Sequence, residues 1–156
     1  MTTATRRSCL VVLLSIAMPP CIAGQANLPG YDAKANPEAD LNRALAEARG
    51  SNKKVLVIAG GEWCVWCHYL ESFVKTNRDV EDALHGAFVT VKVYVGNDNT
   101  NAKFFSRLPK ADGYPHFWVL ENDGKLKKSV NTALLEDGKT SYNKATFLKF
   151  IREMAS

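Results

Sequence analysis

The apolar residues of the chain follow two patterns, short continuous runs and residues three or four positions apart, which predict strands and helices respectively. The runs at 53–60 and 88–95 are rich in branched residues and have the length of buried strands. Helical spacing predicts helices that begin at Asn36 and at Cys64, and a last helix over 144–154. This alternation of strand and helix is typical of an α/β fold.

Residues that start or stop helices set the expected helix bounds. Asn36 is a capping residue followed by Pro37 at the first helical position, and Gly50 is expected to end this helix. Asp79 is expected to cap a short helix that runs through Leu84.

A β-hairpin is expected in the second half of the chain. The runs HFWVLE (116–121) and KLKKSV (125–130) flank Asn122-Asp123-Gly124, which contains an Asp-Gly turn pair. A short helical segment at 103–108 precedes the hairpin. The last helix follows it and is expected to bury three residues, Phe147, Leu148 and Ile151. Together these elements predict a mixed central sheet with helices on both faces.

The first 23 residues are expected to be a signal peptide rather than part of the folded domain. They carry Arg6 and Arg7 without an acidic residue, then the apolar run LVVLLSIAM, with cleavage expected near 23–26. A retained membrane anchor is the alternative, but this run is well short of the roughly 20 residues that a spanning helix needs. The rest of the chain is expected to form a polar lead-in segment, 24–35, and one domain, 36–156.

Removal of the signal peptide changes the charge and the cysteine content of the protein. The formal net charge of +4 falls by two, and the remaining chain holds no basic cluster typical of nucleic-acid binding. The run KLKK at 125–128 is more simply the solvated edge of the hairpin. Cys64 and Cys67 become the only cysteines. We expect an exported protein with no membrane segment after cleavage. The bacterial periplasm is favoured because no ER-retention signal ends the chain, and a secretory lumen or an extracellular location is the alternative.

The stretch EWCVWCH, residues 62–68, is compatible with a redox dithiol, half of a zinc site or a c-type haem attachment sequence. A structural zinc site needs four ligands, and no second cysteine pair accompanies His68, His85 and His116. Haem attachment is disfavoured because a strand leads directly into the motif and the mature chain contains a single methionine, Met154. We favour the dithiol, with no metal and no bound cofactor.

The position of the two cysteines suits thiol chemistry. The N–H groups and the dipole at a helix start stabilise a thiolate, and Cys64 is placed there. Cys67 lies three residues later on the same side of the helix, where it can attack a mixed disulfide formed at Cys64. Cys64 is therefore expected to be the exposed, reactive thiol and Cys67 the enclosed one.

The order of elements resembles the thioredoxin superfamily over residues 52–155. It consists of a strand, WCVWC at a helix start, a second strand, a short helix and then DGYPHF (112–117) opening the hairpin. The resemblance implies that Cys64 attacks and Cys67 resolves. It also implies that Trp63 flanks a substrate groove, and that Pro115, after a cis bond, and the backbone of Tyr114 hold an extended substrate. Taken alone, Gly113-Tyr114-Pro115 is an ordinary turn before a strand, with a trans bond.

The chain also departs from the thioredoxin pattern. Ile58 stands where thioredoxins place a buried aspartate, so the proton acceptor for Cys67 is expected to be water, Glu62 or another group. Lys92 aligns with the lysine that accompanies that aspartate, although a strand lysine that reaches solvent is an equal alternative. Val65 and Trp66 replace the usual pair between the cysteines.

Two further residues near the dithiol have two interpretations each. His68 lies one helical turn from Cys64 and favours the thiolate if charged, with Glu71 three residues further on. We prefer a partly exposed histidine on a solvated face, because surface charge pairs are strongly screened. Trp66 is either a core aromatic or part of an apolar patch that contacts substrates. His85 and His116 are expected to be structural.

These observations predict an exported, thioredoxin-like thiol-disulfide oxidoreductase. It exchanges disulfides with protein substrates through the Cys64–Cys67 dithiol, and an unidentified redox partner recharges it. The alternative from another class is a non-catalytic thioredoxin-like binding or chaperone module that works through its aromatic surface.

Overall fold

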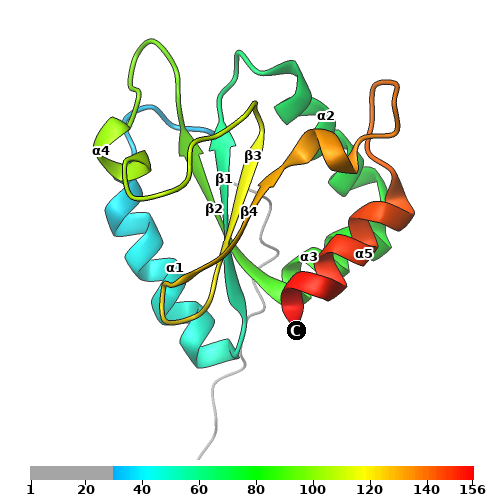
Figure 1. Cartoon of the computed structure of the whole chain (residues 1–156), viewed down its shortest axis with the longest axis horizontal. Helices are drawn as coiled ribbons and strands as arrows, with labels where there is room; N and C mark the ends of the chain where they lie inside the picture. The colour runs from blue at the N-terminus through cyan, green and yellow to red at the C-terminus, as the bar shows by residue number, and fades with distance from the viewer. Residues whose placement is uncertain (1–29) are drawn as a thin grey trace, which may run out of the picture.

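A computed structural model describes residues 30–156, which form a four-stranded sheet with helices on both faces (Figure 1). The expected signal peptide and the first half of the lead-in segment, residues 24–29, lie outside the described residues. The elements, in chain order, are α1 (Pro37–Ser51), β1 (Lys54–Gly60), α2 (Val65–Thr76), α3 (Arg78–Ala87), β2 (Phe88–Tyr94), α4 (Ala102–Phe105), β3 (His116–Leu120), β4 (Leu126–Asn131), a 3₁₀ helix (Thr132–Leu135) and α5 (Lys144–Ala155).

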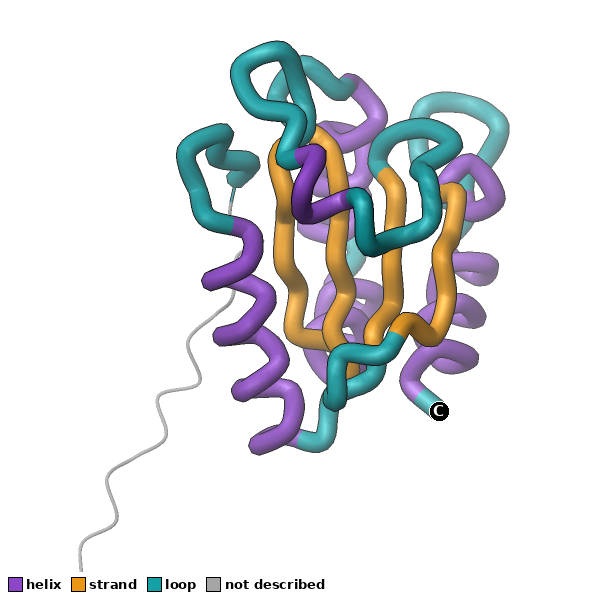
Figure 2. The backbone as a smooth tube through the Cα atoms, turned by 60° about the vertical axis from the view of Figure 1, so that its left-hand side comes forward, coloured by secondary structure: helices purple, strands orange, loops and turns teal. Residues whose placement is uncertain are grey.

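The sheet is mixed, with strand order β2-β1-β3-β4. β1 runs parallel to β2 and antiparallel to β3, and β3 pairs with β4 as the expected hairpin. Ala59 pairs with His116, so the chain leaving β1 and the chain entering β3 meet at one edge of the sheet (Figure 2). The predicted fold class is confirmed.

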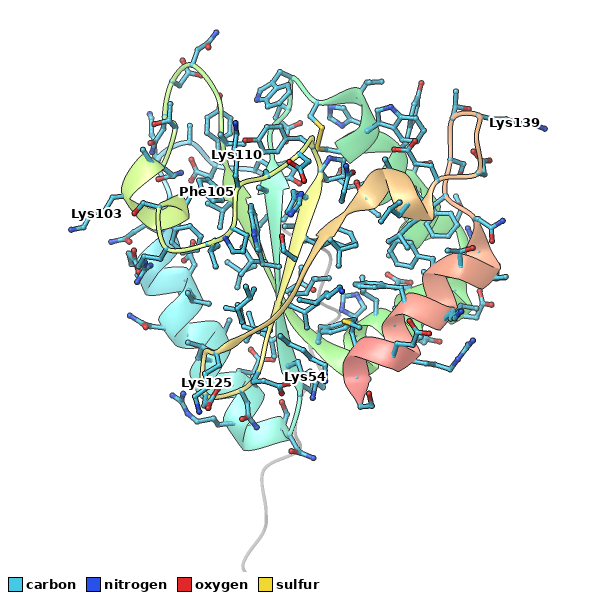
Figure 3. The ribbon with its side chains drawn as sticks, viewed as in Figure 1. Lys54, Lys103, Phe105, Lys110, Lys125 and Lys139 are labelled. Carbon is cyan, nitrogen blue, oxygen red and sulfur yellow. A yellow bond between two sulfur atoms is a disulfide. The ribbon has the colours of Figure 1, made fainter. Side chains whose placement is uncertain are left out.

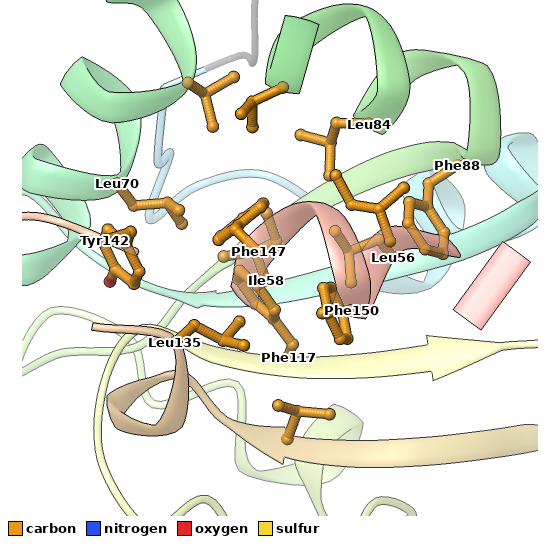
Figure 4. Close-up of a cluster of buried hydrophobic side chains, with 14 of the residues drawn as sticks. Leu56, Ile58, Leu70, Leu84, Phe88, Phe117, Leu135, Tyr142, Phe147 and Phe150 are labelled. Carbon is orange, nitrogen blue, oxygen red and sulfur yellow. The ribbon is translucent and has the colours of Figure 1, made fainter. Parts of the chain in front are cut away.

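Each face of the sheet has its own apolar core. Helices α2, α3 and α5 cover one face, and α1 and α4 cover the other (Figure 1). Successive residues of a strand point to opposite faces, so Leu56 and Ile58 face α2, α3 and α5 while Val57 faces α1. The first core is rich in aromatic rings (Figure 4). In the second, α1 contributes the small residues Ala44 and Ala48, which let this helix lie close to the sheet.

Helix α1 begins as predicted and ends later than predicted. The Asn36 side chain accepts hydrogen bonds from the N–H groups of Glu38 and Ala39. Gly50 does not end the helix, which continues to Ser51. Asn52 supplies the left-handed cap with φ 53°, a conformation that asparagine tolerates better than most residues.

The bounds of α3 and the buried side of α5 also differ from the predictions. The N-cap of α3 is Asn77, not Asp79, and the helix runs to Ala87, three residues past Leu84. Asp79 lies in the first turn, where an acidic side chain suits the helix dipole. Helix α5 buries Phe147, Phe150 and Ile151, whereas Leu148 is only partly buried. The helix expected at 103–108 is the single turn α4, and the 3₁₀ helix was not predicted.

Candidate active site

A disulfide joins Cys64 and Cys67 at the start of α2 (Figure 3). Cys64 is the N-cap residue, with φ −93° and ψ 101°, and the two Cα atoms are 5.2 Å apart. The backbone N–H of Cys67 points at Cys64 Sγ, 3.2 Å away. In the reduced protein the same N–H and the helix dipole stabilise a thiolate on Cys64.

The turn between β1 and α2 sets this position. β1 ends at Gly60, and the N–H of Cys64 donates to the carbonyl of Gly61 at 3.0 Å, which closes a tight turn before the helix begins. The predicted placement of the cysteine pair at a helix N-terminus is therefore confirmed.

The two cysteines differ less in exposure than expected. Cys64 is 4% exposed and Cys67 is 2% exposed, so the expectation of an exposed Cys64 is wrong for the disulfide form. Their neighbours differ instead. Cys64 stands between Trp63 and Val65, each 55% exposed, whereas Cys67 faces the end of β1.

An exposed aromatic pair lies beside the disulfide. The rings of Trp63 and Tyr114 meet edge to face with centroids 5.7 Å apart, and Tyr114 is 37% exposed. The indole N–H of Trp63 donates to the carbonyl of Val95 at 2.7 Å, which fixes the ring against the loop after β2. The two rings form an apolar surface next to Cys64. Such a surface can line one side of a groove that binds a peptide.

The segment before β3 lies at the same edge of the sheet. The Tyr114–Pro115 peptide bond is cis, the isomer expected from the resemblance, and Pro115 itself is buried. The Pro115 carbonyl accepts a hydrogen bond from Thr132 Oγ1 at 2.6 Å. Thr132 was not singled out from the sequence, because its contact spans the length of the hairpin.

Lys92 is buried behind the disulfide rather than exposed. Its side chain is 1% exposed, so the interpretation of Lys92 as a strand lysine that reaches solvent is wrong. The ammonium forms an ion pair with Glu71 of α2 and lies 4.9 Å from the ring centre of Tyr31. Ile58 is its neighbour on β1 and keeps an apolar side chain where the family pattern has an aspartate.

His68 lies on the solvent side of α2. Its ring is 48% exposed, and Nε2 lies 2.8 Å from the Glu62 carbonyl oxygen and 4.0 Å from the Glu62 carboxylate. Glu71 pairs with Lys92, so the less favoured interpretation, in which a charged His68 acts beside Glu71, is wrong. The position of His68 agrees with a partly exposed histidine. Glu62 is also exposed, at 64% of its side chain.

Trp66 packs inward from the disulfide turn. It is partly buried, and its ring meets those of Tyr69 and Tyr142 edge to face at 5.3 and 5.9 Å. This packing favours the core interpretation. The exposed aromatic surface at the disulfide is formed by Trp63 and Tyr114.

His116 is buried directly after Pro115. Its Nε2 lies 2.8 Å from Ser129 Oγ, and its ring packs against Trp118 with centroids 4.6 Å apart. Burial lowers the pKa of His116 below its usual value, with Asp112 acting weakly in the opposite direction. The contacts agree with the structural role expected for this histidine.

Residues 30–156 contain neither a cluster of metal ligands nor a membrane-spanning helix. No group of three or more histidine, cysteine, aspartate or glutamate side chains in this part of the chain is arranged to hold a metal ion. Within the same residues, every helix is too short or too polar to cross a bilayer.

Comparison with known proteins agrees with the fold and the cysteine site. The sequence model of a family described as thioredoxin-like matches residues 36–121, more than half of the chain. The chain therefore belongs to the thioredoxin-like family. It is also similar to the thiol:disulfide interchange protein DsbD of Cronobacter sakazakii, with 33% identity over 69 residues. That match covers 44% of this chain and 12% of the length of DsbD.

Solved structures share the fold at low sequence identity. A disulphide isomerase from Xylella fastidiosa Temecula1 has a TM-score of 0.70 and 23% identity, covering 83% of this chain and 99% of that one. The oxidised C-terminal domain of DsbD from Neisseria meningitidis has a TM-score of 0.57 and 14% identity, covering 76% and 96%. A thioredoxin from Thermus thermophilus has a TM-score of 0.52 and 22% identity, covering 80% and 85%.

Proposed function

We propose that the protein is a thiol-disulfide oxidoreductase that exchanges disulfides with protein substrates through Cys64 and Cys67. The observation that carries the proposal is the Cys64–Cys67 disulfide at the N-terminus of α2, beside the exposed Trp63–Tyr114 pair. The family and two of the proteins similar to this chain, an interchange protein and a disulphide isomerase, support the same chemistry.

In the reducing direction the reaction has two exchange steps. The Cys64 thiolate attacks a substrate disulfide, forms a mixed disulfide and releases one substrate thiolate. Cys67 then loses its proton, and its thiolate attacks Cys64 Sγ. The Cys64–Cys67 bond forms as the mixed disulfide breaks, and the second substrate thiolate leaves and takes up a proton from water. Reversal of the same steps transfers the disulfide to a substrate.

The surroundings of Cys64 suit an extended substrate segment. Trp63 and the backbone of Tyr114 flank the sulfur, and Pro115 offers no N–H that competes for the pairing. We assign Trp63, Tyr114 and Pro115 to substrate binding. Trp66, which the sequence also offered for the substrate surface, packs against Tyr69 and Tyr142 and supports the turn from the core side.

Export and a recharging partner are part of the same proposal. A disulfide persists most readily in an oxidising compartment, and the signal peptide expected at residues 1–23 leads to the periplasm. There the dithiol requires a second redox protein that restores its starting state after each turnover.

Reduction of insulin by dithiothreitol tests the proposed activity. The wild-type protein should accelerate precipitation of the insulin chains, and Cys64→Ser should abolish the acceleration. Trp63→Ala, which keeps both sulfurs, should reduce the rate without abolishing it. Equal rates for wild type and Cys64→Ser would contradict disulfide exchange and favour the non-catalytic binding or chaperone module, which the exposed aromatic pair also suits.

A further inference from the structure

The hydroxyl of Tyr31 lies close to the sulfur of Cys67. If Gly60 carried a Cβ atom, that atom would lie 2.7 Å from Tyr31 Oη and closer still to Cys67 Sγ. The hydroxyl and the sulfur are therefore no more than about 5 Å apart, and both border the space that Gly60 leaves open. Tyr31 belongs to the lead-in segment, which the sequence placed outside the domain, yet its ring packs against the core below α2.

Tyr31 is held there by the buried ion pair. The Lys92 ammonium lies 4.9 Å from the centre of its ring, a distance at which a cation and an aromatic face attract each other. Glu71 neutralises that ammonium and lies one helical turn after Cys67 on α2. The ring of Tyr31 is thereby fixed between β2 and α2 with its hydroxyl toward the end of β1.

The titratable groups around Cys67 come from five segments. β2 contributes Lys92, α2 contributes Glu71, and the turn before α2 contributes Glu62. Tyr142, from the loop before α5, reaches the carbonyl of Trp66 at 3.4 Å. Tyr31 comes from the lead-in segment, and its hydroxyl borders the space at Gly60 beside Cys67 Sγ.

We propose that Tyr31 is a positioning residue for the resolving thiol: its hydroxyl donates a hydrogen bond to the Cys67 thiolate when the disulfide is reduced. This inference rests on the disulfide exchange proposed above and supplies the stabilising group that Ile58 cannot provide. Burial, followed by the negative charge of Glu71, raises the pKa of Tyr31 well above its usual value. The hydroxyl therefore keeps its proton and acts as a donor rather than as a base.

The donor changes one step of the reaction. Cys67 gives up its proton to water, and the resulting thiolate is stabilised by Tyr31 until it attacks Cys64 Sγ. A hydrogen bond to a charged group is stronger than one between neutral groups. Loss of the hydroxyl should lower the fraction of Cys67 present as thiolate at a given pH about tenfold. Attack by Cys64 does not use Tyr31 and should keep its rate.

The direct test is a titration of Cys67 as the only thiol of the full chain, with Cys9, Cys21 and Cys64 replaced by serine. Thiolate absorbance in the ultraviolet gives the pKa of Cys67 without any enzymatic turnover. Tyr31→Phe should raise that pKa by about one unit. Tyr69→Phe is the matched control because it removes a hydroxyl two residues after Cys67 on another side of α2, and it should leave the pKa unchanged.

A single-turnover reaction with dithiobis(nitrobenzoate), a chromogenic aryl disulfide, separates this inference from the proposed function. The reduced protein releases one thionitrobenzoate when Cys64 attacks and a second when Cys67 resolves. Tyr31→Phe should slow the second release about tenfold and leave the first unchanged. A wild-type protein without the second release contradicts disulfide exchange itself. The outcome that overturns only the role of Tyr31 has two parts. The wild-type protein gives both releases, and Tyr31→Phe keeps the wild-type pKa of Cys67 and the wild-type rate of the second release.

Discussion

The two edges of the sheet carry charged residues in different ways. At the edge where β1 ends, the disulfide is backed by Lys92, whose side chain is 1% exposed and has Glu71 as its partner. At the opposite edge, near the β3–β4 turn, Glu121 is flanked by Lys54 at 3.1 Å and Lys127 at 3.4 Å, and these two lysine side chains are 15% and 24% exposed. The lysine at the first edge is therefore fully enclosed, whereas the lysines at the second edge keep part of their surface in water.

Close packing at the disulfide edge should make Gly60→Ala the most damaging of the substitutions considered. The added Cβ would overlap Cys67 Sγ and stand 2.7 Å from Tyr31 Oη, so the helix start or the lead-in segment must shift. Overpacking of this kind should lower the free energy of unfolding by about 3 kcal/mol in urea titrations. The control is Gly86→Ala in α3, where nothing lies within 4 Å of the new atom. It should be neutral or stabilise by up to about 1 kcal/mol, and equal losses at both sites would contradict the packing described for Gly60.

Neutralisation of one carboxylate at each edge compares the two settings directly. Glu71→Gln leaves the buried Lys92 ammonium without its partner and should lower the free energy of unfolding by about 2 kcal/mol. Glu121→Gln should cost less than about 1 kcal/mol, because both of its lysines are partly exposed to water. Hydrogen bonds from Lys54 lower the pKa of Glu121, so its contribution is present above the usual glutamate pKa and is lost as the pH falls through the lowered value. Equal losses for the two variants at neutral pH would remove the distinction between the edges.

The hydroxyl of Thr132 offers a smaller test at the disulfide edge. Thr132→Val removes the donor to the Pro115 carbonyl and should lower the free energy of unfolding by about 1 kcal/mol. Thr90→Val is a matched control, since the buried Thr90 hydroxyl has no hydrogen-bond partner within residues 30–156. Chemical denaturation of both variants should show a loss only for Thr132→Val, and a comparable loss for Thr90→Val would argue against the hydrogen bond as its cause.

The smallest expected effect is a pH dependence that comes from His116. Burial lowers its pKa in the folded state, so the unfolded chain takes up a proton at a higher pH than the folded protein does. Stability is therefore complete above the usual histidine pKa of about 6.5 and falls as the pH is lowered from there toward the folded value. His116→Gln should flatten this part of the profile when unfolding is measured between about pH 5 and 8. An unchanged slope would mean that another group controls it.

Local sequence rules predicted most of the fold because the decisive contacts are local. Asn36 and Pro37 fix the start of α1, and Gly124 adopts the positive φ that the hairpin turn requires. The same rules gave the wrong capping residue where a neighbouring residue could start or end the helix equally well. Asn52 rather than Gly50 supplies the left-handed end of α1, and Asn77 rather than Asp79 starts α3.

The candidate site was only partly predictable. Cys64, Cys67, Trp63 and the Tyr114–Pro115 segment belong to short motifs, and the structure brings them to one edge of the sheet. Which side chains lie next to the two sulfur atoms depends on strand register and on packing between segments that are far apart in the sequence. A polar lead-in sequence gave no sign that Tyr31 reaches Cys67, although an aromatic residue shortly before a capped helix is a signal worth testing in related chains.

The partner of Lys92 illustrates the same limit. Alternation along β2 indicates which face Lys92 occupies, but not that Glu71 of α2 lies opposite it. The sequence allowed His68 as the partner of Glu71, since the two residues are three apart on one helix. The sheet offered a stronger partner, because a buried ammonium must be neutralised whereas an exposed histidine is hydrated.

The central claim is that Cys64 attacks substrate disulfides and Cys67 resolves the product, and mass spectrometry of trapped mixed disulfides tests it most directly. Cys67→Ser incubated with insulin should accumulate a covalent adduct on Cys64 that dithiothreitol releases. Cys64→Ser treated in the same way should form almost none, because Cys67 faces the end of β1 rather than the Trp63–Tyr114 surface. Adducts of equal yield on the two variants, or none on either, would contradict the assignment.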